Sequence, residues 1–461
     1  MSKKEDFRGL HPVAISFWNT WKSSAQNTAI ISGNDCYSFN DLFEQALKYH
    51  SFLQNQTDLS SRILFFNRDD FHSYARLLAI SLAGGSFVPI DSYWPEERIS
   101  ELKKQLKANF ILDNEHQFDG LASFKSLTDL KLFDTSEAYV LYTSGSTGKP
   151  KGVRLLKSNL EAFQHYYTDQ SSYSFTSEDV FLQTFQLHFD FSIFPLMMAW
   201  RYGSKLVLCD FSSFRFLQIP DLVEKHRITV LTMVPYVLSY IEKYMNEFKF
   251  DDIRYSIFGG GPLYLDQAKK WNDCLPNGEI RNVYGPTETT IICTDYKGFE
   301  AKNGMIAMGY MFPDLDYRIV NQELLIAGNQ TFPGYINAYE DCFVEIDGEQ
   351  FYPTGDLVSE DEKGLLFFEG RKDFQIKLDG YRIELEEIEG KVQEAFGINS
   401  QAALIDNELC LIVEQIPEDL ESFLKTSFPT YMQVKRVLKI EAFKLNSNRK
   451  LDRQANLNLI K

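Results

Sequence analysis

The order of apolar and polar positions predicts alternating strands and helices in the first part of the chain. Between residues 62 and 112, short apolar runs alternate with segments in which apolar residues recur every three or four positions. These periodicities are typical of buried strands and amphipathic helices. We expect strands at Ile63–Phe66, Phe87–Ile90 and Phe110–Leu112, and helices at Phe71–Leu82 and Pro95–Leu106. Such alternation predicts a layered, largely parallel sheet.

A shorter pattern precedes this region, and the same alternation continues after it. Ala29-Ile-Ile and Tyr37-Ser-Phe flank a Gly33-Asn34-Asp35 turn and predict a strand pair, and Asp41 then leads apolar residues at helical spacing. Further strands are expected in the apolar run beginning at Ala138 and at Val180–Leu182, Lys205–Leu208, Thr229–Met233 and Tyr255–Phe258.

The pattern changes between about residues 310 and 370, where short alternating segments predict an antiparallel, barrel-like piece. These segments are Tyr317–Val320, Glu323–Ala327 and Leu365–Phe368. From Phe374 onward we expect a compact terminal unit with one strand, an acidic helix at Glu384–Val392 and two later strand–helix alternations. The predicted domains are residues 1–372 and 373–461, with the boundary near Asp373.

The composition provides enough apolar residues for a large hydrophobic core, and the net charge limits the class of binding partner. The chain has 461 residues, of which 44% are hydrophobic and 15% aromatic, so a large domain and a smaller one are expected. Its 47 basic and 64 acidic residues give a net charge of −17, which disfavours nucleic acid or an anionic membrane as a partner.

Cysteine spacing and the N-terminal segment predict a soluble cytoplasmic protein. The six cysteines are scattered and have neither metal-like spacing nor the pattern of a disulfide framework. The first residues, Met-Ser-Lys-Lys-Glu-Asp, lead into no apolar signal core. No run approaches the roughly 18 apolar residues that a spanning helix needs.

A hydroxyl- and glycine-rich loop after the strand at Ala138 carries the first candidate chemistry. From Thr143 to Lys149 the loop holds four hydroxyls, two glycines and a lysine. Backbone N–H groups, hydroxyls and a lysine are the groups that cradle polyphosphate. A Walker-type loop is excluded, because that motif needs glycine where Thr143 stands and Ser or Thr where Pro150 stands.

The segment from Leu141 to Val153 closely resembles the phosphate-binding loop of the adenylate-forming enzymes, which include acyl-CoA synthetases and amino-acid adenylation domains. Asn282–Thr290 and Tyr352–Asp356 resemble further motifs of that family, and Gly370–Glu389 is a second long match. The resemblance spans about residues 25 to 455. It implies an α/β fold with a large N-terminal domain of layered sheets and a barrel-like piece, followed by a small mobile α+β C-terminal domain.

The same resemblance implies an ATP and Mg²⁺ site. Tyr284 would stack near the adenine, Thr287 would contact the α-phosphate region, and Glu288 would help to hold Mg²⁺, which prefers hard oxygen ligands. Asp356 would accept hydrogen bonds from the ribose hydroxyls. The implied ATP-binding set is Thr143, Ser144, Gly145, Ser146, Thr147, Gly148, Lys149, Gly259, Gly260, Gly261, Asn282, Tyr284, Gly285, Thr287, Asp356, Arg371 and Lys450.

Leu445–Arg453 resembles the family's lysine loop, with Arg449 in place of the usual glycine. Lys450 is therefore the expected catalytic lysine, together with Glu288 and Thr143 in the catalytic set. In family terms Arg371 reaches the ribose and phosphate. Asp373 would be the hinge about which the terminal domain turns between the two half-reactions.

Phe189-Asp190-Phe191 indicates the class of acid that is activated. In amino-acid-activating members the matching aspartate pairs with the substrate's α-ammonium, and an unpaired buried ammonium is costly. Phe191 and Phe194 should occupy much of the space available to the substrate's side chain, and Gly259 should leave some of that space open. The inferred pocket consists of Phe189, Asp190, Phe191, Phe194, Thr232, Ile257, Gly259, Val283, Ile291 and Ile292. It predicts a small uncharged amino acid, with alanine of either hand first.

The chain looks most like stand-alone enzymes of the D-alanine–D-alanyl carrier protein ligase type, although those often carry cysteine where Gly259 stands. The predicted function is formation of aminoacyl-AMP with release of pyrophosphate, then transfer to the phosphopantetheine thiol of a separate carrier protein. Two alternatives stay open. One is an acyl-CoA ligase for a small carboxylic acid, and the other is a non-catalytic relative that binds nucleotide or carrier.

Overall fold

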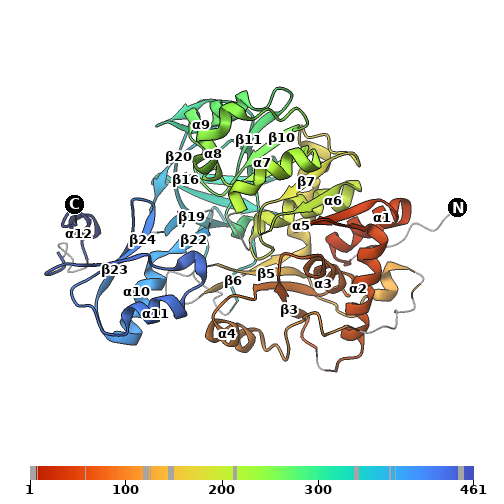
Figure 1. Ribbon diagram of the computed structural model, residues 1–461, viewed down its shortest axis with the longest axis horizontal. Helices are drawn as coiled ribbons and strands as arrows, with labels where there is room; N and C mark the ends of the chain where they lie inside the picture. Colours follow the sequence, from red (N-terminus) through yellow and green to blue (C-terminus); the bar gives the residue numbers. More distant parts are fainter. Residues whose placement is uncertain are drawn as a thin grey trace. The chain divides into compact units, whose positions relative to one another are not determined.

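A computed structural model describes residues 7, 9–57, 59–117, 124, 126–143, 150–210, 215–336, 342–372, 375–378, 381–444 and 451–460. Contacts within the chain divide it into two units. The first consists of Met1–Ser92, Lys103–Leu141 and Val153–Gly370, and the second of Tyr93–Leu102, Tyr142–Gly152 and Arg371–Lys461. Figure 1 shows the elements of both units and labels many of them.

One sheet of the first unit has the strand order β15-β12-β11-β10-β9-β7-β8-β1-β2. Its central strands, from β11 to β1, run parallel, whereas β12, β15 and β2 are antiparallel to their neighbours. This confirms the predicted layered, largely parallel sheet. The strands are β1 (Thr28–Ser32), β2 (Asp35–Ser38), β7 (Val180–Gln183), β8 (Lys205–Leu208), β9 (Val230–Met233), β10 (Tyr255–Phe258), β11 (Glu279–Tyr284), β12 (Thr294–Tyr296) and β15 (Tyr310–Met311).

A second sheet has the order β3-β4-β5-β6, and β3, β4 and β5 pair in parallel. Its strands are β3 (Arg62–Asn67), β4 (Ser86–Asp91), β5 (Glu137–Thr143) and β6 (Lys151–Leu156). Every residue of β5 before Thr143 is buried, as the apolar run beginning at Ala138 predicts.

Helices connect the two sheets through an apolar layer. Helix α3 (Phe71–Leu82) packs on β3 and β4, α6 (Ile193–Tyr202) packs on β7 and β8, and α1 (Pro12–Ser24) contacts both helices (Figure 1). Phe17 of α1 meets Trp200 of α6 edge to face with ring centroids 5.3 Å apart. Since these rings are fully buried, they belong to one core shared by both sheets.

The first unit contains further helices. Helices α7 and α9 both contact α8, and α9 also contacts β11. The bounds are α2 (Phe39–Gln54), α5 (Lys157–His165), α7 (Arg215–His226), α8 (Val237–Ile241) and α9 (Leu265–Asp273). Helix α4 (Glu96–Leu106) begins in the second unit and ends in the first. Short 3₁₀ turns are η1 (Leu127–Leu130), η3 (Asp190–Ser192), η4 (Glu242–Glu247) and η5 (Thr287–Thr289), and η2 (Tyr166–Gln170) is a π-helical turn.

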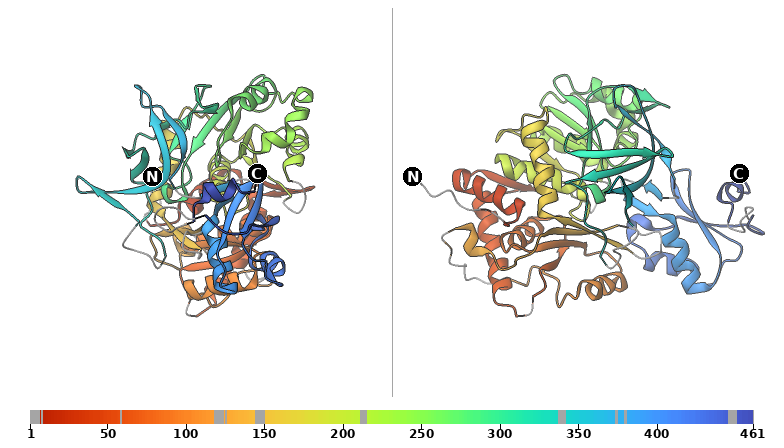
Figure 2. Two further views of the ribbon diagram at one scale, coloured as in Figure 1. Left: turned by 90° about the vertical axis from the view of Figure 1, so that its left-hand side faces the viewer. Right: turned by 180° about the vertical axis from the view of Figure 1, so that it is seen from behind.

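A curled antiparallel sheet confirms the barrel-like piece expected from the alternating segments after residue 310. It has the order β16-β17-β19-β18, with β20 also paired to β19, and Figure 2 shows it in teal and light blue. The strands are β16 (Leu315–Val320), β17 (Glu323–Gly328), β18 (Val344–Ile346), β19 (Glu349–Glu360) and β20 (Leu366–Arg371). A small hairpin of β13 (Ala301–Lys302) and β14 (Met305–Ile306) precedes it.

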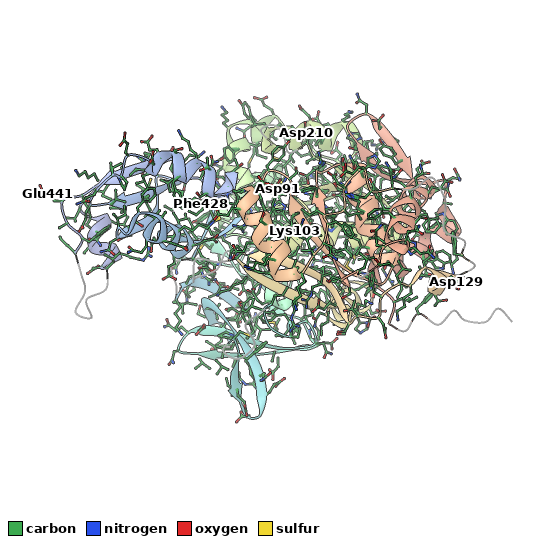
Figure 3. All side chains as sticks on the ribbon, turned by 90° about the horizontal axis from the view of Figure 1, so that it is seen from below. Asp91, Lys103, Asp129, Asp210, Phe428 and Glu441 are labelled. Carbon is green, nitrogen blue, oxygen red and sulfur yellow. The ribbon has the colours of Figure 1, made fainter. Side chains whose placement is uncertain are left out.

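The second unit has its own apolar core. A sheet of the order β23-β24-β25 packs with α10 (Leu385–Phe396), and Phe428, labelled in Figure 3, lies in the core with Leu420 and Leu424 of α11. The other bounds are β21 (Gln375–Leu378), β22 (Tyr381–Glu384), β23 (Ser400–Ile405), β24 (Glu408–Val413), β25 (Arg436–Lys439), α11 (Leu420–Ser427), η6 (Thr430–Met432) and α12 (Arg453–Leu457).

Three sequence expectations differ from the structure. The segment at 110–112 is not a strand: Leu112 forms an isolated bridge with Phe65, and Phe110 instead packs its ring on Phe52 and His116. Phe39 begins α2, because the Ser38 hydroxyl caps the helix. The single strand expected after Phe374 is a hairpin of β21 and β22.

The predicted boundary at Asp373 stays a prediction, since Asp373 lies outside the described residues. Within the described parts of the chain, no helix combines the length and apolarity that crossing a membrane requires.

Candidate active site

The carboxyl ends of β9, β10 and β11 lie side by side. Phe258 of β10 is in register with Met233 of β9 and with Asn282 of β11. The loops that leave these strands therefore begin at the same edge of the sheet, which is where ligands bind in open α/β sheets. Gly259–Gly261 follow β10, and Gly285–Glu288 follow β11. The structure thus brings together two motifs that are more than twenty residues apart in the sequence.

Tyr284, the last residue of β11, is held by a carboxylate of the curled sheet. Its hydroxyl donates a hydrogen bond to Asp356 Oδ2 at 2.6 Å, and Asp356 is only 4% exposed on β19. Burial and the neighbouring Asp356 charge raise the pKa of Tyr284 well above its usual value. The phenol therefore stays protonated and orients the carboxylate. The two residues that the resemblance assigns to adenine and ribose are direct neighbours.

Glu288 lies in the short turn η5 after Gly285-Pro286 and is fully buried. Its Oε1 accepts a hydrogen bond of 2.8 Å from the hydroxyl of Tyr335. A carboxylate is the hard ligand that Mg²⁺ prefers, and Mg²⁺ is usually held by one or two carboxylates together with substrate phosphates. The described residues contain no group of three or more His, Cys, Asp or Glu that could hold a metal ion by itself. Glu288 thus fits a cation shared with bound phosphate rather than an all-protein cage.

The chain after Glu288 adopts a constrained turn. Thr290 and Ile291 have φ of 60° and 73°, a region that β-branched residues rarely enter. Gln330 supports this turn, because its amide donates to the carbonyls of Ile292 at 2.8 Å and Thr289 at 3.2 Å. Thr290 Oγ1 returns a 2.5 Å hydrogen bond to the Gln330 carbonyl. These bonds hold Ile291 and Ile292, two of the predicted pocket residues, beside the end of β11.

Glycine is required beneath this turn and after β10. A Cβ on Gly285 would lie 2.5 Å from the carbonyl oxygen of Ile291, which is too close for any residue other than glycine at this position. Gly260 has φ of +82°, which favours glycine.

Among the buried polar atoms that have no hydrogen-bond partner within the described residues, two belong to the predicted ATP set. Asn282 Nδ2 donates to the carbonyl of Ala307 at 2.8 Å, whereas its Oδ1 has no partner. Thr143 Oγ1, at the end of β5 in the second unit, is likewise unpaired. Orphaned buried polar atoms are costly unless a ligand or water satisfies them. The Asn282 oxygen can accept a hydrogen bond from an amino group, and the Thr143 hydroxyl can donate one to a phosphate oxygen. ATP carries both kinds of group.

The residues predicted to bind the substrate surround the start of α6. Phe189 and Asp190 are half-buried, and Phe191 is 7% exposed. Ser192 fixes this turn, because its hydroxyl donates to the Phe189 carbonyl at 2.6 Å. Burial, and then the charge of Asp190, raise the pKa of Tyr139 in β5. Asp190 thus lies close enough to act electrostatically on the opposite sheet.

The floor of the predicted pocket is apolar. Ile257 and Thr232 are in register on β10 and β9 and are fully buried. The expectation that Gly259 returns space is wrong: a Cβ built there would lie 2.8 Å from Phe191 Cε1 and 3.0 Å from Val283 Cγ2. Phe191 itself fills that volume. Phe194 follows one turn later, with its ring centroid 6.2 Å from that of Phe191.

Several predicted residues lie outside the described residues, namely Ser144–Lys149, Asp373 and Lys450. Arg371 ends β20 and is assigned to the second unit, whereas Tyr284, Glu288 and Asp356 are in the first. The roles of all these residues stay predictions.

Tyr335 and Gln330 were not found from the sequence. Gln330 contacts the Glu288 turn from 40 residues away and Tyr335 from 47 residues away. The Pro333-Gly334 pair before Tyr335 indicates a turn, but nothing in the sequence indicates which residue that turn contacts.

Comparison with known proteins supports the resemblance to the adenylate-forming enzymes. Residues 131–336 match the family described as AMP-binding enzyme. The D-alanine–D-alanyl carrier protein ligase of Lactococcus lactis subsp. lactis is 29% identical over 91% of this chain and 93% of its own length. The ligase of the same name from Listeria monocytogenes serotype 4a is also 29% identical, again over 91% of this chain and 93% of its own.

Solved structures agree on the fold. The Vibrio cholerae adenylation domain AlmE, crystallised with glycyl-adenosine-5'-phosphate, superposes with a TM-score of 0.83. It is 23% identical and the alignment covers 100% of this chain and 99% of that one. The chain is thus similar in sequence to these two carrier protein ligases over 91% of its length and has the fold of the adenylation domain.

Proposed function

We propose that the protein activates a small uncharged amino acid as its adenylate and then transfers the aminoacyl group to the phosphopantetheine thiol of a separate carrier protein. The observation that carries the proposal is the packing of Phe191 over Gly259, directly beside Asp190. A carboxylate can pair with the substrate ammonium, and an apolar floor without side-chain depth excludes larger groups. The names of the two relatives, which specify D-alanine and a carrier protein, support the same substrate and acceptor.

In the first half-reaction a substrate carboxylate oxygen attacks the α-phosphorus of ATP, the new O–P bond forms, and the bond to pyrophosphate breaks. Both reactants are anionic, so positioning and charge stabilisation are the main requirements. Asp190 binds the ammonium, Asp356 and Tyr284 orient the nucleoside, and Lys450 acts between the carboxylate and the α-phosphate. Bound Mg²⁺ supplies neutralisation of phosphate charge, and Glu288 is the residue that would hold it.

In the second half-reaction the carrier thiol attacks the acyl carbon, the thioester forms, AMP leaves, and the thiol proton passes to solvent. Rotation of residues 373–461 about Asp373 would give the thiol access to the adenylate. No side-chain nucleophile is needed in either step.

The size of the substrate's side chain is the most specific part of the proposal. Sequence alone favours alanine of either hand as the substrate. Because the ring of Phe191 packs over Gly259, glycine becomes a second expected substrate. A wall of this kind separates side chains that differ by one methylene by about 1–3 kcal/mol.

The test is amino-acid-dependent exchange of pyrophosphate into ATP with the twenty amino acids, D-alanine, propionate and acetate. We expect the highest kcat/KM for glycine or an alanine enantiomer and very low values for the des-amino acids. Higher activity with propionate, together with thioester formation on coenzyme A, would instead establish the acyl-CoA ligase. No exchange with any acid, despite ATP binding, would favour a non-catalytic relative.

A further inference from the structure

The segment from Phe332 to Tyr335 forms two hydrogen bonds with Glu288. The backbone N–H of Phe332 donates to the Glu288 carbonyl at 2.8 Å, and the hydroxyl of Tyr335 donates to Glu288 Oε1 at 2.8 Å. Both donors come from one short stretch, and Glu288 is fully buried between the turn after β11 and this stretch. The main chain and the side chain of Glu288 are therefore fixed by the same segment.

Tyr335 is itself held in place. It is 8% exposed, and its ring packs edge to face on Phe332 with centroids 4.8 Å apart and an interplanar angle of 70°. Its backbone forms a bridge with Val153, and its hydroxyl lies 3.4 Å from that of Tyr352 on β19. A buried aromatic residue with only two rotatable side-chain bonds loses little further freedom when it donates a hydrogen bond. The position of the phenol oxygen is therefore set by packing before any ligand arrives.

A glutamate has three side-chain torsions, and fixing them costs free energy when a ligand must do so. A hydrogen bond from a fixed donor selects one arrangement in advance, and a carboxylate has about four lone-pair sites that can accept from donors or bind a cation. Ligands of metals are oriented in this way by hydrogen bonds from neighbouring groups, and loss of such a group commonly weakens metal binding by about 10- to 100-fold.

We propose that Tyr335 is a positioning residue that presents the carboxylate of Glu288 to the Mg²⁺ ion shared with ATP. The inference rests on the proposed function, because it takes Glu288 as the protein's ligand for that ion. It adds a residue to which neither the sequence motifs nor the comparisons give a role.

The test removes only the hydroxyl. In Tyr335→Phe we expect the dissociation constant of Mn²⁺, titrated by electron paramagnetic resonance into full-length protein with α,β-methylene-ATP, to rise about tenfold. The Mg²⁺ concentration that half-saturates pyrophosphate exchange should rise by the same factor, whereas KM for the amino acid should stay unchanged. Unchanged Mn²⁺ affinity, with or without a lower melting temperature, would mean that Tyr335 only packs.

Tyr317→Phe is the matched control. The Tyr317 hydroxyl also donates to a glutamate, Glu360, but on the exposed curled sheet. We expect no change in Mn²⁺ affinity in this variant.

Glu288→Gln separates failure of the inference from failure of the proposed function. If Glu288→Gln leaves Mn²⁺ affinity at the wild-type value, the metal role of Glu288 in the proposed function is wrong. If Glu288→Gln weakens Mn²⁺ binding but Tyr335→Phe does not, only the positioning role is wrong. Adding Tyr335→Phe to Glu288→Gln should weaken binding no further; an additional tenfold loss would show that Tyr335 acts independently of Glu288.

Discussion

The ring of Phe191 occupies the volume that a side chain at Gly259 would need, with Cε1 of the ring 2.8 Å from the position of a Cβ. The two residues are far apart in the sequence, on the turn before α6 and after β10. Each therefore limits what the other can be. A larger residue at position 259 would displace the ring, and a smaller one at position 191 would leave a cavity.

Phe191→Leu should shift the substrate optimum toward larger side chains. The shorter side chain opens space above Gly259, so kcat/KM for valine relative to alanine should rise about tenfold, the value of roughly one methylene in an apolar pocket. The pyrophosphate-exchange panel measures this ratio. Phe250→Leu, which changes a buried ring packed on Trp271 instead, should leave the ratio unaltered, and an equal shift in both variants would point to general loosening.

Asp190→Ala should raise KM for the amino acid and reduce the preference over its des-amino analogue. The variant leaves the substrate ammonium without a partner, at a cost of about 1–3 kcal/mol or more. The ratio of kcat/KM for alanine and propionate reports this directly. Asp210→Ala, at an exposed aspartate, is the control, and a preserved ratio in Asp190→Ala would assign the ammonium to another residue.

Lys450→Ala should nearly abolish adenylate formation and leave ATP affinity and folding close to those of the wild type. A group that acts on charge developing in the transition state typically contributes about 10²–10³ in kcat. Pyrophosphate exchange, ATP binding and the melting temperature should be measured together. The exposed Lys439→Ala in the same unit serves for comparison, and full exchange activity in Lys450→Ala would make Lys450 a solvated surface charge.

His11→Asn should make the free energy of unfolding depend less on pH in the acid range. Burial lowers the pKa of His11 from 6.5 to about 3, and the ring lies 3.0 Å from the Ala138 carbonyl through Nε2 and accepts from Val13 N through Nδ1. Between these two pH values the unfolded state binds the proton and the folded state does not. The stability contribution of His11 is therefore fully present above pH 6.5 and is lost as pH falls toward 3.

The measurement is the free energy of unfolding against pH for both proteins. Their difference should change by up to about 1.4 kcal/mol for each pH unit below the unfolded pKa. Burial raises the pKa of Asp69 to about 7 and that of Asp295 to about 6, which gives slopes of the opposite sign. Those two carboxyls are present in both proteins and cancel in the difference. Parallel profiles would show that His11 titrates normally.

Local patterns predicted those elements whose stability is decided locally. The helix Phe71–Leu82 was predicted with its observed bounds, because apolar residues recur at helical spacing. The structure shows that the Asp70 side chain caps its first turn. The segment at 110–112 failed for the opposite reason. Its apolar residues are buried in a ring cluster rather than in a ladder, and composition does not distinguish these two environments.

The positions of the candidate site residues were predictable where motifs are continuous and not where contacts are long-range. Asn282–Thr290 indicated Tyr284 and Glu288, and the structure places both at the carboxyl edge of the sheet. The contact of Glu288 with Tyr335 depends on how the segment after β17 returns to the sheet, which no local pattern encodes. The space above Gly259 was misjudged because it depends on the rotamer of Phe191.

Gln330 makes the turn after Glu288 dependent on a residue that is synthesised much later. The left-handed Thr290 and Ile291 are disfavoured in an isolated peptide, and the bonds that hold them come from position 330. A nascent chain that has emerged from the ribosome only to residue 320 would contain every side chain from Asn282 to Ile292, yet the turn would lack the hydrogen bonds that Gln330 provides. An N-terminal fragment ending before Gln330 should therefore lack the ordered turn after Glu288 even where its sheet has formed.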